Sequence, residues 1–363
     1  MRLGWKELVR RPGRFLAAGG ALMLIVILLL LLGGLLDGLF NASTGAYRAQ
    51  TAELIVYSED SRDSLLRSRI DPATEDEIRA VPGVRGVSGM GAVLIAGRVL
   101  GGTTVDLAVF GYEAPNRQVP GPPEPGTAYA DVTLEDEGVG LGDTIAIGPS
   151  EVPVEVVGWV EDTRYLAQGA LWVEPGTWHE VLVTARPDAA LDEDTFQVSL
   201  VEAADGAETV AERIREQVPG TSPMTIDDAV FALPGVEAQS DTFAQIIGVT
   251  FVVAGLVVAL FFALVVLERL GLLGMLKAVG ASTRQLAAGL VTQAVLVALG
   301  AFVLGGAISL ALAAIVPAEV PVELEARRAV LTGVGVVATA LIGSAVSFRR
   351  IVRIDPASAV GGS

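Results

Sequence analysis

The sequence predicts a membrane protein with four transmembrane α-helices and a large α+β extracytoplasmic domain inserted between the first and the second. Three observations predict this fold class: four uncharged apolar stretches, basic residues in the short segments beside them, and a long acidic region after the first stretch. The stretches cover 15–36, 242–267, 285–318 and 329–348. At about 1.5 Å of rise per residue, about 20 residues cross the roughly 30 Å hydrocarbon core of a bilayer.

These stretches divide the chain into nine segments. We expect a cytoplasmic amphipathic helix at 1–14, transmembrane helices at 15–40, 241–267, 285–317 and 329–348, an extracytoplasmic domain at 41–240, a cytoplasmic elbow at 268–284, a short outer loop at 318–328 and a cytoplasmic tail at 349–363. The first apolar stretch is longer than a secretory signal core and lacks a clean A-x-A site, so we expect an uncleaved signal anchor.

Charge location predicts the orientation. Eleven Arg or Lys and three acidic residues lie in the segments 1–14, 268–284 and 349–363, which gives these segments a net charge of +8. The remainder of the chain has fourteen Arg and 39 acidic residues, a net charge of −25. The two values add up to the net charge of −17 of the whole sequence. Basic short segments stay in the cytoplasm, which places both termini inside a multi-pass protein of a prokaryotic plasma (inner) membrane. The residues expected to anchor the inner face are Arg10, Arg11, Arg14, Arg349, Arg350 and Arg353. For the N-terminal arginines, plain positive-inside flanking sequence is an equally good interpretation.

The inserted domain mixes strand and helix patterns. Strands are predicted at 54–57, 93–95, 105–110, 144–147 and 152–160, and helices at 72–81 and 207–218. Both predicted helices end at Val-Pro-Gly, and a strand pattern follows each of them. This echo predicts two strand–helix–strand units, although it is short and a chance similarity stays open.

The elbow at 268–284 carries the most informative local signals. The segment from Glu268 to Val279 continues as helix, and Gly280 stands where a helix C-cap is expected. Ser282 and Gln285 then have the spacing of a capping box, which starts the next helix. The segment is either a tight helical hairpin at the bilayer surface or a rigid knob that a cytosolic partner pushes.

The sequence excludes several kinds of chemistry. It has no Cys and a single histidine, His179, so thiolate metal sites, disulfides and a histidine-dependent triad are not expected. The apolar stretches hold no ionisable residue, which argues against ion-coupled transport, and no Walker A sequence is present. The acidic balance argues against nucleic-acid binding. We therefore expect no catalytic residue, metal or cofactor on this chain, and a separate ATPase if the protein transports.

Three segments resemble the MacB/FtsX-type permeases of ABC transporters, in their DevC-like and haem-exporter-like branch. LGWKELVRRPGR at 3–14 is similar to the family's basic N-terminal helix, ERLGLLGMLKAVGAS at 268–282 to its "E-R…K-A-[VI]-G-A" loop, and RIDPASA at 353–359 to its closing "D-P-x-x-A" element. GLGDTI at 140–145 is a weaker likeness. The length of the inserted domain fits the exporter branches better than the cell-division branch.

The resemblance implies a permease homodimer, or a dimer with a related permease, in contact with membrane lipid and with two copies of a cytosolic ABC ATPase that binds ATP and Mg. It also implies that the elbow is the coupling helix. The positions implied to shape the ATPase contact are Glu268, Arg269, Lys277, Gly280, Ala281 and Ser282. The implied function is ATP-driven mechanotransmission with export or extraction of an amphipathic or lipophilic substrate. The alternative is a non-transporting, FtsX-like transmitter that activates an extracytoplasmic enzyme or sensor, and an extracytoplasmic adaptor or effector stays open in both cases.

Overall fold

The structure is a computed structural model that describes residues 12–99, 102–187, 191–192, 194–268, 275, 279–280, 282–317 and 320–352, with side chains of 12–18 and 346–352 outside the description. The chain divides into two compact units. The first comprises Met1–Gly38 and Ser240–Ser363, and the second comprises Leu39–Gln239. The helix expected at 1–14 therefore lies almost wholly outside the described residues, as does most of the tail expected at 349–363.

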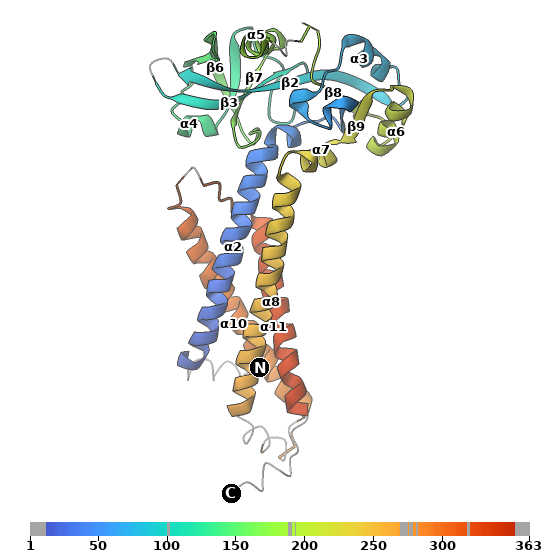
Figure 1. Cartoon of the computed structure of the whole chain (residues 1–363). Coiled ribbons are helices and arrows are strands. Elements are labelled where there is room, and N and C mark those ends of the chain that lie inside the picture. The colour runs from blue at the N-terminus through green and yellow to red at the C-terminus, as the bar shows by residue number, and fades with distance from the viewer. Residues whose placement is uncertain are drawn as a thin grey trace. The chain divides into compact units, whose positions relative to one another are not determined.

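The first unit contains long apolar helices. They are α2 (Pro12–Arg48), α8 (Val236–Glu268), α10 (Thr283–Ala313) and α11 (Ala326–Val352), and α2 and α8 each also contribute residues to the second unit (Figure 1). Within the described residues, these four helices are long and apolar enough to cross a membrane. The predicted arrangement of four apolar helices, with a domain inserted between the first and the second, is therefore confirmed.

Small residues let the helices of the first unit approach closely. Val26, Phe262, Ala298 and Ala340, one from each helix, are all buried in one apolar core. A Cβ added at Gly305 of α10 would lie 3.1 Å from the carbonyl oxygen of Met23 on α2. Close backbone contact of this kind, with van der Waals packing, is how spanning helices associate in the absence of a hydrophobic driving force.

The second unit is built on a mixed nine-stranded sheet (Figure 1). Its strands are β1 (Leu54–Ser58), β2 (Val84–Val99), β3 (Thr104–Tyr112), β4 (Thr127–Asp131), β5 (Thr144–Ile147), β6 (Val152–Val160), β7 (Gly169–Val173), β8 (Val198–Ala203) and β9 (Thr221–Thr225). Their order is β3-β7-β4-β6-β5-β2-β8-β1-β9, and β2 also pairs with β3. The 16-residue β2 thus closes six strands into a ring and also joins them to β8, β1 and β9.

Short helices complete the second unit. They are η1 (Glu59–Ser61), η2 (Leu65–Arg67), α3 (Pro72–Arg79), α4 (Thr133–Asp136), α5 (Pro175–Ala185), α6 (Ala207–Gln217) and α7 (Ile226–Ala232). The predicted echo corresponds to α3 followed by β2 and α6 followed by β9. Gly83 and Gly220, which end the two Val-Pro-Gly sequences, have φ of 96° and 82°, a conformation that favours glycine. Ile78 of α3 and Ile214 of α6 are buried in the same apolar core.

Candidate functional site

The described part of the elbow has the local geometry that its sequence predicts. Val279 donates a backbone hydrogen bond to the carbonyl of Met275 at 3.0 Å, as in a helix, and Gly280 has a φ of 103°. The amide of Gln285 then donates to Ser282 Oγ at 3.2 Å, and the amide of Ser282 donates to Gln285 Oε1 at 3.0 Å. The predicted capping box is confirmed, and it fixes the point where α10 begins.

The described residues include some of the positions assigned to the inner face. Glu268 is the last residue of α8, and Gly280 and Ser282 lie at the turn into α10. The positions outside the described residues are Arg10, Arg11, Arg269, Lys277, Ala281 and Arg353, together with the side chains of Arg14, Arg349 and Arg350. The roles given to these residues in ATPase contact and inner-face anchoring stay predictions.

A loop of the second unit is fastened to the last turns of α2, and sequence analysis missed it. Ala46 donates a backbone hydrogen bond to the carbonyl of Arg164 at 3.0 Å, and the amides of Leu166 and Ala167 donate back to the carbonyls of residues 43 and 42 at 3.1 and 3.0 Å. Gly45 makes this approach possible: a Cβ there would lie 2.6 Å from the carbonyl oxygen of Asp162. The loop at 162–168 is therefore in backbone contact with the helix.

A buried carboxylate holds the start of this loop. Asp131, 1% exposed at the end of β4, accepts hydrogen bonds from the amide and hydroxyl of Thr163 at 2.9 and 2.7 Å. It also accepts from the amide and hydroxyl of Thr133 at 3.1 and 2.6 Å. Charge-assisted bonds of this kind satisfy a buried carboxylate and fix its neighbours. Asp131 thereby links the sheet to the loop that contacts Gly45.

The beginning of α8 is built into the same core as the end of α2. Leu233 and Val236 are buried together with Ala46 and Tyr47 in one apolar cluster of the second unit. The rings of Phe40 and Phe231 lie 6.0 Å apart. The last turns of α2 and the first residue of α8 are thus part of the core of the second unit, which we call the sheet domain.

A charged pair lies at one end of the first unit. We call this end, where Asp37 of α2 and Ala326 of α11 lie, the outer end. The guanidinium of Arg328 on α11 donates two hydrogen bonds to the carboxylate of Asp37 on α2. The first apolar stretch predicted from the sequence ends at 36, one residue before Asp37. The fourth begins at 329, one residue after Arg328, so neither charged residue was part of a predicted stretch. Glycines make the approach possible here as well, since a Cβ at Gly38 would overlap the carbonyl of Pro321.

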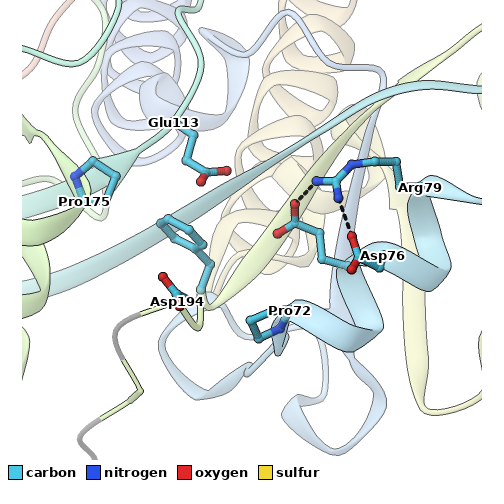
Figure 2. A pocket seen from close by; sticks show the side chains of 8 residues that line it. Pro72, Asp76, Arg79, Glu113, Pro175 and Asp194 are labelled. Atoms are coloured by element: carbon cyan, nitrogen blue, oxygen red, sulfur yellow. Dashed lines mark hydrogen bonds and ion pairs between the residues drawn. The ribbon is translucent and has the colours of Figure 1, made fainter.

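A small acidic hollow opens in the second unit. It has a volume of about 240 Å³ and is lined by Glu75, Asp76 and Arg79 of α3 and by Glu113 and Asp194 (Figure 2). Arg79 forms ion pairs with Glu75 and, at 2.6 Å, with Asp76. Burial, and secondly the nearby Glu113, raise the pKa of Glu75 above its ordinary value of 4.5, and these effects outweigh Arg79.

This shift predicts a pH dependence of stability. A carboxyl group whose pKa is raised by folding favours the native state while it is protonated, and that contribution is lost as the pH rises from 4.5 through the raised value. Glutamine stays uncharged at every pH, so we expect Glu75→Gln to keep at higher pH the stability that the protonated carboxyl provides. The melting temperature of this variant should therefore change less between about pH 4 and 7 than that of the wild type. Thermal unfolding of the full chain in detergent measures this, with Glu77→Gln, on the exposed face of α3, as the control. A Glu75→Gln profile that parallels the wild type would contradict it.

Comparison with known proteins gives one domain match and several relatives. Residues 245–356 match the family described as FtsX-like permease C-terminal. An uncharacterised ABC transporter permease of Mycobacterium tuberculosis is 42% identical over 125 residues, which are 34% of each chain, so this match spans about a third of that relative. A permease protein of Staphylococcus epidermidis, HrtB, whose name assigns it to a hemin transport system, is 20% identical over 100% of this chain and 99% of its own.

One solved structure shows a partial likeness to this chain. The periplasmic region of MacB from Actinobacillus actinomycetemcomitans is 12% identical, and the alignment covers 50% of this chain and 91% of that one with a TM-score of 0.33. Residues 245–356 include most of α8, all of α10 and α11, and the elbow. The chain is therefore a multi-pass membrane protein whose residues 245–356 match the FtsX-like permease C-terminal domain.

Proposed function

We propose that the chain is the permease subunit of an ATP-driven ABC transporter of the MacB/FtsX type. One observation carries the proposal: α8 is a single helix from Val236, buried in the core of the sheet domain, to Glu268, where the elbow begins. A force applied at the elbow by an ATPase would act along this helix on the sheet domain. The match of 245–356 to a permease domain supports the same function.

The proposed complex contains two permease chains, identical or related, and two cytosolic ATPase subunits that bind ATP and Mg. The elbow, including Gly280 and Ser282, is the proposed ATPase contact. The sheet domain is extracytoplasmic, and its movement exports or extracts an amphipathic substrate from the membrane. The name of the full-length relative supports hemin as the first compound to test.

Co-purification and ATP hydrolysis test the proposal. We expect the tagged full-length chain to retain an ABC ATPase in mild detergent. In nanodiscs, hemin or another amphipathic compound should raise the ATPase rate by about twofold or more, since substrate binding and ATP hydrolysis are linked. Lipids and peptides are tested in parallel arms.

Two outcomes count against this function. If no ATPase associates with the chain, the permease assignment is wrong. If an ATPase associates but no compound changes its rate, while an extracytoplasmic protein binds the sheet domain, the chain is a non-transporting transmitter.

A further inference from the structure

A hollow at the outer end of the first unit combines an apolar wall with a charged rim. It has a volume of about 340 Å³ and lies among residues of α2, α8 and α11. Ile247 and Phe251 of α8 and Leu331 of α11 form its apolar wall. Asp37, Glu325, Arg327 and Arg328 are the charged residues that line it. This combination suits a ligand with a polar head and an apolar body.

Two of the four charges are already satisfied by each other. Arg328 and Asp37 form a two-bond ion pair, and their side chains are 31% and 13% exposed. This pair is neutral and geometrically fixed, because two of the three guanidinium nitrogens donate to one carboxylate. It closes one side of the hollow without offering a free charge to a ligand.

The other two charges are free within the described part of the chain. Neither the carboxylate of Glu325 nor the guanidinium of Arg327 forms an ion pair or a side-chain hydrogen bond there, and both residues are exposed. They stand two residues apart at the start of α11, where side chains at that spacing do not face each other. The hollow therefore presents one unpaired positive and one unpaired negative group.

The apolar wall extends away from this rim along the helices. Phe251 lies nine residues beyond 242, the start of the apolar stretch in α8, which corresponds to about 13 Å along the helix. Leu331 lies one helical turn after Arg327 in α11. A ligand that reaches from the rim to Phe251 therefore spans the headgroup region and the outer part of the hydrocarbon core.

We propose that this hollow binds a phospholipid whose headgroup carries both a phosphate and a primary ammonium. The phosphate pairs with the Arg327 guanidinium, the ammonium pairs with the Glu325 carboxylate, and an acyl chain lies against Ile247, Phe251 and Leu331. Guanidinium–phosphate and ammonium–carboxylate hydrogen bonds are strong because both partners are charged.

The two free charges discriminate among lipids. An anionic headgroup without an amine leaves Glu325 unpaired and repelled by the ligand. A quaternary ammonium has no N–H to donate to that carboxylate. The site is therefore specific for the primary amine, and this inference goes beyond the proposed transport function and does not depend on it.

Native mass spectrometry of the full-length protein tests the site. The protein is delipidated in detergent and offered equal amounts of phosphatidylethanolamine, phosphatidylglycerol and phosphatidylcholine with the same acyl chains. We expect phosphatidylethanolamine to be retained about tenfold more strongly than either of the others, the ratio expected for one lost charge-assisted bond. Glu325→Gln should remove most of this preference. Arg327→Gln should instead weaken the retention of all three lipids, because each of them carries a phosphate.

Arg284 supplies a matched control. It is the second residue of α10, as Arg327 is the second residue of α11, and both are exposed. The two helices begin at opposite ends of the first unit (Figure 1). Arg284→Gln should leave both the retention and the preference unchanged. An arginine that only extends toward lipid headgroups would give the same effect at both positions.

Three results would overturn the proposal. The first is equal retention of phosphatidylethanolamine and phosphatidylglycerol by the wild type. The second is a loss of phosphatidylethanolamine retention in Arg327→Gln that is no larger than the loss in Arg284→Gln. The third is full displacement of the lipid by an equal concentration of glycerophosphoethanolamine, because a headgroup without chains cannot use the apolar wall. None of these measurements involves an ATPase, so failure of this proposal is distinguishable from failure of the proposed function.

Discussion

Gly45→Ala is expected to destabilise the sheet domain by about 3 kcal/mol, at the upper end of the usual cost of overpacking. The added Cβ would lie 2.6 Å from the carbonyl oxygen of Asp162 and 3.0 Å from the amide nitrogen of Arg164, which are backbone atoms that cannot rotate away. To relieve the clash, the loop at 162–168 must move off α2. That movement breaks hydrogen bonds such as the one from Ala46 to Arg164 and strains those of Asp131.

Chemical unfolding followed by tryptophan fluorescence measures this effect, because Trp159, Trp172 and Trp178 lie in the sheet domain and Trp5 is the only other tryptophan. Gly20→Ala is the control in the same helix, since a Cβ there meets no atom within 4 Å. We expect that control to be neutral or stabilising, as alanine favours helix over glycine. Wild-type stability of Gly45→Ala would show that the backbone contact does not hold the loop.

Gly280→Pro is expected to uncouple the ATPase from the sheet domain while the sheet domain itself stays folded. The φ of 103° at Gly280 is incompatible with proline, whose ring fixes φ near −65°. The turn between the helical residues before Gly280 and the N-cap Ser282 must then change, and with it the surface proposed to meet the ATPase. We expect substrate-stimulated ATP hydrolysis to fall by about tenfold or more, equivalent to at least about 1.4 kcal/mol in activation free energy.

Two further variants separate turn geometry from general damage. Gly280→Ala should give an intermediate loss, because a left-handed conformation costs a non-glycine residue about 1–2 kcal/mol. Gly248→Ala, in α8 with no atom within 4 Å of the added Cβ, should keep wild-type activity. If Gly280→Pro keeps both ATPase association and stimulated activity, the elbow is not the coupling element.

Features governed by local sequence could be predicted. The apolar stretches gave the four helices because about 20 apolar residues in succession are rare outside membranes. The Ser282–Gln285 capping box and the strands at 54–57, 144–147 and 152–160 depend on neighbours within a few residues, and the structure has each of them.

Features that depend on distant residues could not be predicted. The pair between Asp37 and Arg328 joins residues 291 positions apart, and each lies one residue outside a predicted apolar stretch. The need for glycine at position 45 arises only because the loop at 162–168 meets it. Strand β7 was missed because its five residues are all buried and show no alternation, which is the usual signal of a strand.

In the proposed function, ATP acts at the elbow and moves the sheet domain relative to the apolar helices. The chain contains no cysteine, so two can be introduced for spin labels without further changes, at the exposed positions Gln118 in the sheet domain and Leu304 on α10. Electron–electron double resonance on the reconstituted complex then measures the distance between the labels with and without Mg-ATP. We predict that ATP shifts the distance distribution in the wild type and leaves it unchanged in Gly280→Pro. An unchanged distribution in the wild type, or an equal shift in Gly280→Pro, would contradict the account.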